Sequence, residues 1–181
     1  MPIRVIAGEA RGRLLKSVAR PGTRPTSDRV REALFALLEA RGARFERVLD
    51  LYSGTGALGI EALSRGAGHC DFVEADARAC DVIRENLRLT GFTPRSTVYC
   101  LPVSRALGRL QGGYTLVVAD PPYEYDRAES EIGAVVERGL MAPDGMLVVE
   151  HSKRREWPEA LGGRRRILSR RHGDTALTVY Q

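Results

Sequence analysis

Short apolar runs alternate with segments of helical periodicity between Val48 and Glu150. Five of these runs have the length of buried strands, and they cover residues 47–52, 69–74, 97–101, 114–119 and 146–150. Between them, residues 76–90 lead to Gly91, a residue type common at helix C-caps. Ile132, Val135 and Leu140 fall on one face of a later helix. Strands that alternate with helices predict an α/β fold on a parallel sheet.

Two further β-like runs follow at residues 164–170 and 175–181, separated by His172-Gly173-Asp174. A connection this tight predicts an antiparallel hairpin at one edge of the sheet. The expected domain is therefore Rossmann-like, with a mostly parallel seven-stranded sheet and a C-terminal antiparallel hairpin.

The chain before the sheet has a different pattern. Residues 3–7 and 13–17 predict two short strands, and the Pro- and Gly-rich residues 20–26 predict a loop. Thr26-Ser27-Asp28 offers N-cap candidates for an amphipathic helix that presents Val30, Leu34 and Leu37 to the core. We divide the chain into a basic N-terminal hairpin extension, residues 1–25, and a main domain, residues 26–181.

Charge is unevenly distributed over the 181 residues. Residues 1–48 hold 11 basic and 5 acidic side chains, residues 49–150 hold 9 and 15, and residues 151–181 hold 8 and 3. Basic ends favour a polyanionic partner such as nucleic acid, although 26 of the 28 basic residues are Arg, which a GC-rich genome also produces. The acidic middle fits a cofactor that is itself positive.

Several classes of protein are disfavoured. No uncharged stretch approaches the ~18–20 apolar residues of a membrane span, and the first residues lack the apolar core of a secretory signal. Cys70, Cys80 and Cys100 form no Cys-x-x-Cys pair, so we expect reduced thiols in a cytoplasmic protein and no metal site.

A glycine-rich loop follows the first predicted strand of the sheet. Gly54, Gly56 and Gly59 satisfy G-x-G-x-x-G, and Glu74 ends the next predicted strand. This pattern is typical of dinucleotide binding, with the carboxylate on a ribose hydroxyl. S-adenosylmethionine (SAM) also contains adenosine, so it would use the same residues.

Asp50 favours SAM over a nicotinamide dinucleotide. A carboxylate at the tip of the strand would oppose a pyrophosphate at the helix start, whereas it would favour the ammonium and sulfonium groups of SAM. The expected cofactor-binding residues are Asp50, Ser53, Gly54, Thr55, Gly56 and Glu74.

Asp120, Pro121, Pro122 and Tyr123 follow the predicted strand 114–119. The two prolines remove backbone donors and fix φ, which leaves a rigid rim of acceptors. The Asp120 carboxylate and a backbone carbonyl, that of Pro121, could accept both hydrogens of an aromatic amine, and Tyr123 could stack on its ring. We expect these four residues to be catalytic.

The loop and the Asp-Pro-Pro-Tyr tetrapeptide resemble those of class I SAM-dependent amino-methyltransferases. Arg11-Gly12-Arg13, residues 24–35 (RPTSDRVREALF) and residues 49–65 (LDLYSGTGALGIEALSR) closely resemble the RsmD-type 16S ribosomal RNA guanine-N2-methyltransferases, which modify guanine 966. The resemblance covers essentially the whole chain. It implies methyl transfer from SAM to the N2 amine of an unpaired or flipped guanine in 16S RNA, either free or within a 30S subunit or assembly intermediate.

Six basic residues near the N-terminus are candidates for contacts with the RNA phosphates: Arg11, Arg13, Lys16, Arg20, Arg24 and Arg29. Residues 164–166 form a second candidate patch. Three alternatives stay open: an amino-methyltransferase acting on DNA or another RNA, a nicotinamide-dependent oxidoreductase, and a catalytically silent RNA-binding module.

One position departs from the family pattern. Similar enzymes usually have Asp-Ala or Asn-Ala after the third strand, where the polar side chain holds the adenine amino group. This chain has Pro102-Val103 instead. We therefore expect backbone groups and apolar contacts to hold adenine, with weaker SAM affinity.

Overall fold

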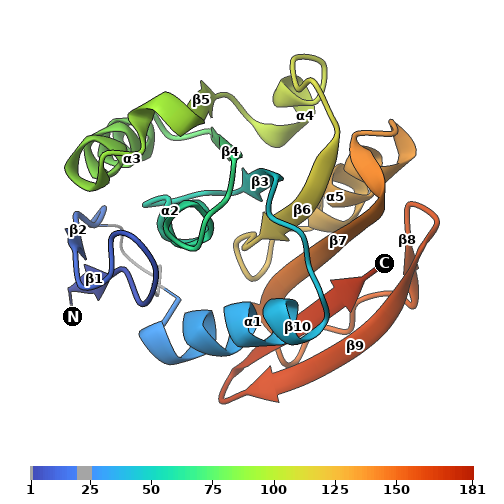
Figure 1. The fold of residues 1–181 in the computed structure, drawn as a ribbon. Coiled ribbons are helices and arrows are strands. Elements are labelled where there is room, and N and C mark those ends of the chain that lie inside the picture. The colour runs from blue at the N-terminus through green and yellow to red at the C-terminus, as the bar shows by residue number, and fades with distance from the viewer. Residues whose placement is uncertain (1, 20–25) are drawn as a thin grey trace.

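A sheet of eight strands, among the residues that the structure describes, forms the centre of the computed structural model (Figure 1). The structure describes residues 2–19 and 26–181. The spatial order of the strands is β5-β4-β3-β6-β7-β10-β9-β8. The parallel strands are β3 (Arg47–Leu51), β4 (His69–Glu74), β5 (Ser96–Cys100), β6 (Tyr114–Ala119) and β7 (Met141–Ser152). The antiparallel strands are β8 (Ala160–Leu161), β9 (Arg164–His172) and β10 (Thr175–Tyr180).

This topology confirms the predicted fold class, with two differences in the strands. β7 begins at Met141 rather than at residue 146. Residues 142–145 (Ala-Pro-Asp-Gly) lack an apolar pattern, and the pairing of β7 with β6 shifts register between Tyr114 and Leu116. β8 is an additional eighth strand, and its two residues are too few to produce a periodicity.

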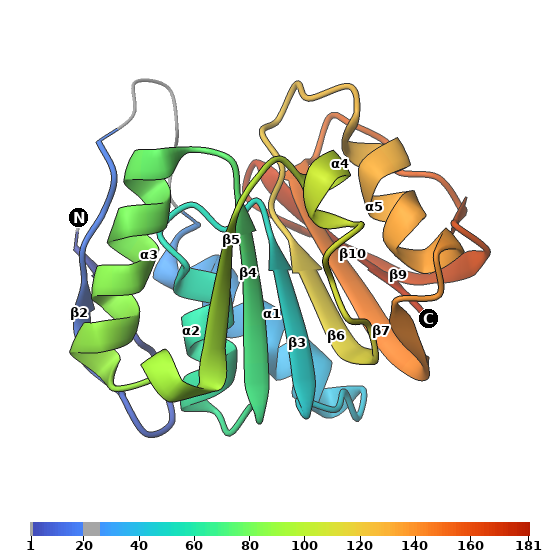
Figure 2. The ribbon, with the colours of Figure 1, turned by 90° about the horizontal axis from the view of Figure 1, so that it is seen from above.

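Helices cover both faces of the sheet (Figure 2). Apolar residues of α1 (Asp28–Ala40), α2 (Ala57–Ser64) and α3 (Ala77–Thr90) share one core cluster with Val48, Val118 and Val148. Apolar residues of α4 (Val103–Ala106) and α5 (Ala128–Glu137) share a second cluster with the alternate strand residues Leu49, Val117 and Val149. A short 3-10 helix (Thr93–Arg95) follows α3. Because successive strand residues point to opposite faces, the two clusters form a three-layer domain.

The predicted helix ends are confirmed by their caps. The Ser27 side chain accepts a hydrogen bond from the amide of Val30 at the start of α1. Asp76 caps α3 by accepting from the amide of Ala79, and α3 ends at Gly91 with a φ of +78°. Only glycine adopts that conformation readily, which explains why the helix stops there.

The N-terminal hairpin is hydrogen-bonded to the helices beside it. Its strands, β1 (Ile3–Arg4) and β2 (Leu14–Leu15), are shorter than predicted. Glu61 of α2 accepts from the amides of residues 6 and 7 at 2.9 and 3.0 Å. Asn86 of α3 bonds to both the amide and the carbonyl of Lys16, and also donates to the carbonyl of Thr55 in the glycine loop.

The hairpin also contributes to the apolar core. Ile3, Val5 and Leu15 are buried in the same cluster as α1 and α2. Removing the first 20 residues would therefore expose apolar surface of the main domain as well as remove positive charge.

Gly59 allows α2 to pack closely on β4. A Cβ atom at this position would lie 2.3 Å from the Phe72 ring and 2.8 Å from the Cys70 sulfur. Such contacts are far inside van der Waals distance, so the third glycine of the loop motif is required by packing between helix and strand.

Some of the predicted exclusions can be compared with the structure. Within residues 2–19 and 26–181, no helix is long and apolar enough to cross a membrane. The same residues contain no group of three or more His, Cys, Asp or Glu side chains placed to hold a metal ion. All three cysteines are free thiols.

Candidate active site

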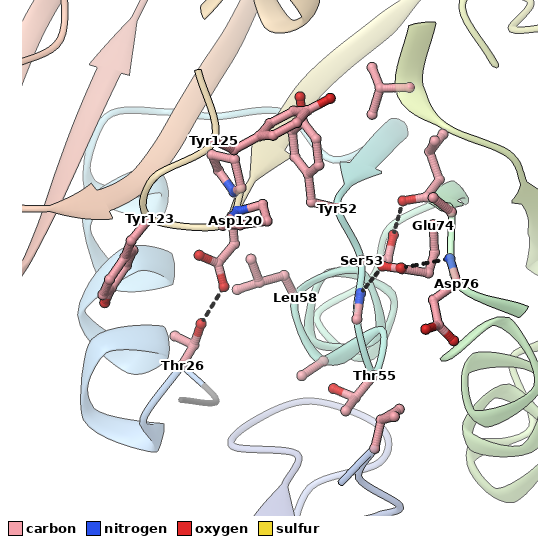
Figure 3. A pocket seen from close by; sticks show the side chains of 18 of the residues that line it. Thr26, Tyr52, Ser53, Thr55, Leu58, Glu74, Asp76, Asp120, Tyr123 and Tyr125 are labelled. Carbon is pink, nitrogen blue, oxygen red and sulfur yellow. Dashed lines mark hydrogen bonds between the residues drawn. The ribbon is translucent and has the colours of Figure 1, made fainter. Parts of the chain in front are cut away.

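A pocket of about 670 Å³ lies where β3, β4 and β6 end (Figure 3). Ser53, Gly54, Thr55 and Glu74 line one side. Asp120, Pro121, Pro122 and Tyr123 line the other. Parallel strands present their carboxyl ends at one edge of a sheet, so the loop that follows each strand opens onto the same cavity. Two motifs that are far apart in the sequence therefore face a common space.

The glycine loop is held in shape by its own backbone. The Ser53 hydroxyl donates to the carbonyl of Asp50 at 2.7 Å, and the Gly56 amide donates to the carbonyl of Ser53 at 2.7 Å. Gly54 and Gly56 have φ values of +58° and +81°. These left-handed conformations favour glycine, and Gly56 is the N-cap of α2. The loop thus presents backbone to the pocket.

Glu74 lies at the centre of the loop side. One of its carboxylate oxygens accepts from the Gly54 amide at 2.8 Å, and the other accepts from the Asp76 amide at 3.1 Å. Glu74 also lines the pocket, so its carboxylate both holds the loop and faces the space where hydroxyl groups of a ligand would lie. Val73, Ala75 and Val103 line the pocket nearby.

Asp50 lies beneath the glycine loop and is not among the pocket-lining residues. Its Oδ2 atom accepts from the Gly59 amide at 2.9 Å, and its Oδ1 atom has no hydrogen-bond partner among the described residues. Burial, followed by the nearby carboxylates of Asp120 and Glu74, raises the pKa of Asp50 well above its ordinary value. Asp50 therefore supports the loop from behind and adds to an acidic environment around the pocket.

Asp120 begins the opposite rim, directly after β6. Burial raises the pKa of Asp120 to about 6, and a hydrogen bond from Thr26 opposes that shift. The Asp120 Oδ2 atom accepts from the Thr26 hydroxyl at 3.0 Å. Pro121 is buried, whereas Tyr123 is 45% exposed and its hydroxyl is hydrogen-bonded to that of Thr175. A tyrosine ring fixed at its tip and open on its face can stack on a planar base.

Sequence reasoning missed Thr26 and Glu150 as members of the site. Thr26 was an N-cap candidate, but Ser27 caps the helix, and the Thr26 hydroxyl lies 2.9 Å from the Glu150 Oε2 atom. Burial and the charge of Asp120 raise the pKa of Glu150 to about 8. The available signals were the position of Thr26 in the RPTSD segment and a glutamate at the end of an otherwise apolar run.

A second missed group is formed by two tyrosines and a glutamate. Tyr52 and Tyr125 donate to the two carboxylate oxygens of Glu131 at 2.7 and 2.8 Å. The tyrosine rings meet edge to face, with centroids 6.0 Å apart. Arg155 donates to the backbone carbonyl of Tyr125 at 3.0 Å. These contacts fasten the segment after Tyr123 to α5. The rim at residues 120–123 is therefore held by β6 before it and by α5 after it.

The predicted phosphate contacts lie in different places. Lys16 and Arg29 are exposed near the pocket, which is lined by Ser17, the residue after Lys16, and by Thr26, three residues before Arg29. Arg11 and Arg13 are exposed at the far turn of the hairpin. At this turn the Glu9 amide donates to the backbone carbonyl of Ser64, the last residue of α2. The first residue of α2, Ala57, lines the pocket, so the turn and the pocket lie at opposite ends of this helix. Arg20 and Arg24 lie outside the described residues.

The second basic patch is partly committed to structure. Arg164 donates to the backbone carbonyls of Gly145 and Ala142 at 2.6 and 2.7 Å. Arg166 donates to the carbonyl of Trp157 at 2.9 Å, and Arg165 is exposed. Two of these three guanidinium groups therefore bind the chain itself.

Comparisons with known proteins agree with this geometry. The family model described as "Conserved hypothetical protein 95" matches residues 3–181. The Bacillus subtilis protein YlbH is 36% identical over 184 residues, covering 99% of this chain and 98% of YlbH. "Ribosomal RNA small subunit methyltransferase D" of Escherichia coli K12 is 35% identical over 148 residues, covering 82% of this chain and 74% of the relative.

A solved structure extends the similarity to three dimensions. The Escherichia coli protein YhhF has a TM-score of 0.83 and 29% identity, covering 100% of this chain and 98% of YhhF. The residues matched by the family model, 3–181, include the glycine loop, Glu74 and the Asp120–Tyr123 rim. The chain belongs to the family described as conserved hypothetical protein 95 and is an RsmD-type methyltransferase.

Proposed function

We propose that this protein transfers a methyl group from SAM to the exocyclic N2 amine of a guanine in 16S ribosomal RNA. The observation that carries the proposal is the meeting of a nucleoside-type glycine loop and an acidic, proline-fixed rim in one pocket. Relatives named as ribosomal RNA methyltransferases support the substrate class, and the resemblance to the RsmD type supports guanine N2.

The loop side of the pocket fits SAM. The Glu74 carboxylate faces the pocket and would accept from ribose hydroxyls, and the backbone of Gly54 and Thr55 faces the cavity. Val73, Ala75 and Val103 offer an apolar surface for adenine. When bound, SAM supplies an electrophilic methyl group on a sulfonium.

The charge of the site favours SAM over a dinucleotide. Glu74 and Asp120 lie close enough to Asp50 for their charges to raise its pKa. A pyrophosphate would be repelled by these carboxylates, whereas a cationic sulfonium and ammonium would be attracted. The nicotinamide-dependent alternative leaves both this acidic cluster and the rim without a purpose.

The rim side would hold the amine. The Asp120 carboxylate and the Pro121 carbonyl can accept the two N–H hydrogens, which directs the nitrogen lone pair toward the glycine-loop side. Asp120 also stabilises positive charge as it develops on the amine. Tyr123 can stack on the base, which must be unpaired or flipped out to enter the pocket.

The proposal is tested by methylation with labelled SAM. We expect label in 16S RNA, offered as free RNA, as a 30S subunit and as an assembly intermediate, with duplex DNA as a fourth substrate. Nucleoside mapping should identify N2-methylguanosine. Label found as N6-methyladenosine, or found in DNA alone, would reject guanine in RNA as the target while leaving the amino-methyltransferase activity intact.

For the RNA interface, we expect the double variant Lys16→Gln/Arg29→Gln to bind RNA more weakly and to show a flatter dependence of affinity on salt. Each lost phosphate contact should reduce that slope by about 1. Substitution is preferable to deleting the hairpin, because the deletion would also expose buried apolar residues.

The matched control is Arg44→Gln. Arg44 is exposed and pairs with Asp144. It precedes β3, at the amino ends of the parallel strands, whereas the pocket lies at their carboxyl ends. Its loss should leave the salt slope unchanged. A parallel measurement on Arg11→Gln/Arg13→Gln shows whether the RNA extends along the hairpin. An unchanged slope for Lys16→Gln/Arg29→Gln would remove both residues from the interface.

A further inference from the structure

The Thr26 hydroxyl stands between two carboxyl groups. It lies 3.0 Å from Asp120 Oδ2 and 2.9 Å from Glu150 Oε2. A hydroxyl carries a single hydrogen, so Thr26 can donate to only one of them. The other contact is a hydrogen bond only if that carboxyl group carries a proton and donates to Thr26. For both contacts to be hydrogen bonds, the three side chains must hold two hydrogens between their oxygens: that of the Thr26 hydroxyl and one on a carboxyl group.

The surroundings decide which carboxyl group holds the proton. Glu150 is 3% exposed on β7, so ionising it is costly, whereas Asp120 opens onto the pocket. Burial raises the pKa of both groups, to about 8 for Glu150 and about 6 for Asp120. Among residues 2–19 and 26–181, the cation that acts on Glu150 is Arg31 of α1, whose guanidinium donates to Asp28. The proton therefore rests on Glu150 near neutral pH.

Other charged groups around the pair reinforce this assignment. The charges of Asp120 and Glu74 already raise the pKa of the buried Asp50, so carboxyl groups repel one another at this end of the sheet. A second ionised carboxylate at Glu150 would increase this repulsion. A neutral Glu150 avoids it and keeps the site at one negative charge on the rim.

We propose that Thr26 and a protonated Glu150 are positioning residues of the methyl-transfer site: Glu150 donates to Thr26, and Thr26 donates to Asp120. This direction leaves Asp120 ionised, with its second oxygen available to accept an N–H of the substrate amine. The assignment rests on the proposed function for its consequence in catalysis, but the location of the proton can be measured without substrate.

The consequence is a rate that depends on pH on both sides of neutrality. Below the pKa of Asp120, its carboxyl group would be protonated and could donate to the amine instead of accepting from it. Above the pKa of Glu150, the hydroxyl of Thr26 would have two anions competing for its one hydrogen. The rate should rise as pH increases past about 6 and fall as it increases past about 8.

The test compares pH profiles of kcat for Glu150→Gln and the wild type on the same RNA. The amide of Gln donates to Thr26 as a protonated Glu does but cannot ionise. We expect kcat near pH 7 to stay within about threefold of wild type, since one hydrogen bond replaces another, and the fall on the alkaline side to disappear or move to higher pH. Glu137→Gln, an exposed change on α5, should keep the wild-type profile.

Thr26 is tested by an isosteric pair. Thr26→Val removes the hydroxyl at nearly constant volume, so kcat should fall about tenfold or more, with the KM for SAM little changed. Thr26→Ser retains the hydroxyl and should restore most of the rate. A Thr26→Val enzyme with wild-type kcat, or a Glu150→Gln enzyme that keeps the alkaline fall, would overturn the proposal.

An infrared measurement gives a readout besides activity. The difference spectrum of wild type minus Glu150→Gln at pH 7 should contain the carbonyl stretch of a protonated carboxyl group. A band from Asp50, whose pKa is also raised by burial, is common to both proteins and cancels. If the difference spectrum lacks the stretch, the proton is not on Glu150 and the assignment is wrong. Failure to methylate any guanine would instead reject the proposed substrate and leave this result standing.

Discussion

Asp120→Ala should lower kcat by about 10²–10³-fold while the dissociation constant for SAM stays close to that of the wild type. Loss of one preorganised group that stabilises developing charge has a cost of this order. Asp120 lies on the rim opposite the glycine loop, so its removal leaves the contacts of Gly54 and Glu74 in place. Single-turnover methylation of RNA, together with calorimetric titration of SAM, separates the two effects.

Glu124→Ala is the matched control for this prediction. Glu124 is exposed in the same segment, just after the rim, so its loss changes the local charge by the same amount without touching the pocket. Its kcat should match that of the wild type. A near-normal rate for Asp120→Ala would show that the carboxylate does not hold the amine.

Glu74→Ala should raise the dissociation constant for SAM about 10–100-fold. Hydrogen bonds to a charged group contribute about 1.5–3 kcal/mol each, which corresponds to this range of affinity. Glu74 also accepts from the amides of Gly54 and Asp76, so the variant loses support for the loop as well as a contact to ribose. Calorimetric titration gives the affinity, and the melting temperature without ligand reports the loss of loop support.

Two variants separate ribose binding from a general effect of charge. Glu74→Gln keeps one acceptor oxygen and should bind SAM with intermediate affinity. Asp81→Ala removes a carboxylate from an exposed position on α3, where its side chain is 78% exposed, and should bind SAM normally. An unchanged dissociation constant for Glu74→Ala would exclude Glu74 from the ribose site.

Local patterns predicted the sheet and the loop well because each signal lay within a few residues. The five apolar runs, the Gly91 cap and the Gly173 turn specify their own structure through burial and backbone conformation. The start of β7 was missed because Met141 pairs with β6 ahead of an irregular stretch, residues 142–145, that has neither a β6 partner nor an apolar pattern. There the neighbouring strand, rather than the local sequence, determines the conformation.

The site was predictable only in part, for a similar reason. Asp120 and Glu74 end apolar strands, so topology places them at one edge of the sheet. Thr26, by contrast, meets Glu150 across 124 positions of sequence, and no spacing rule brings a loop residue to a strand end. The spacing of Asp50 suggested a ligand contact, but its bond to the Gly59 amide is visible only in three dimensions.

The docking of the N-terminal hairpin also imposes an order on folding. The groups that hold it, Glu61 and Asn86, lie 55 and 70 positions after the backbone amides that they bind. Such long-range contacts must wait until the intervening chain exists. During synthesis, the hairpin leaves the ribosome before α2 and α3, so it is fixed in place only after both helices have emerged.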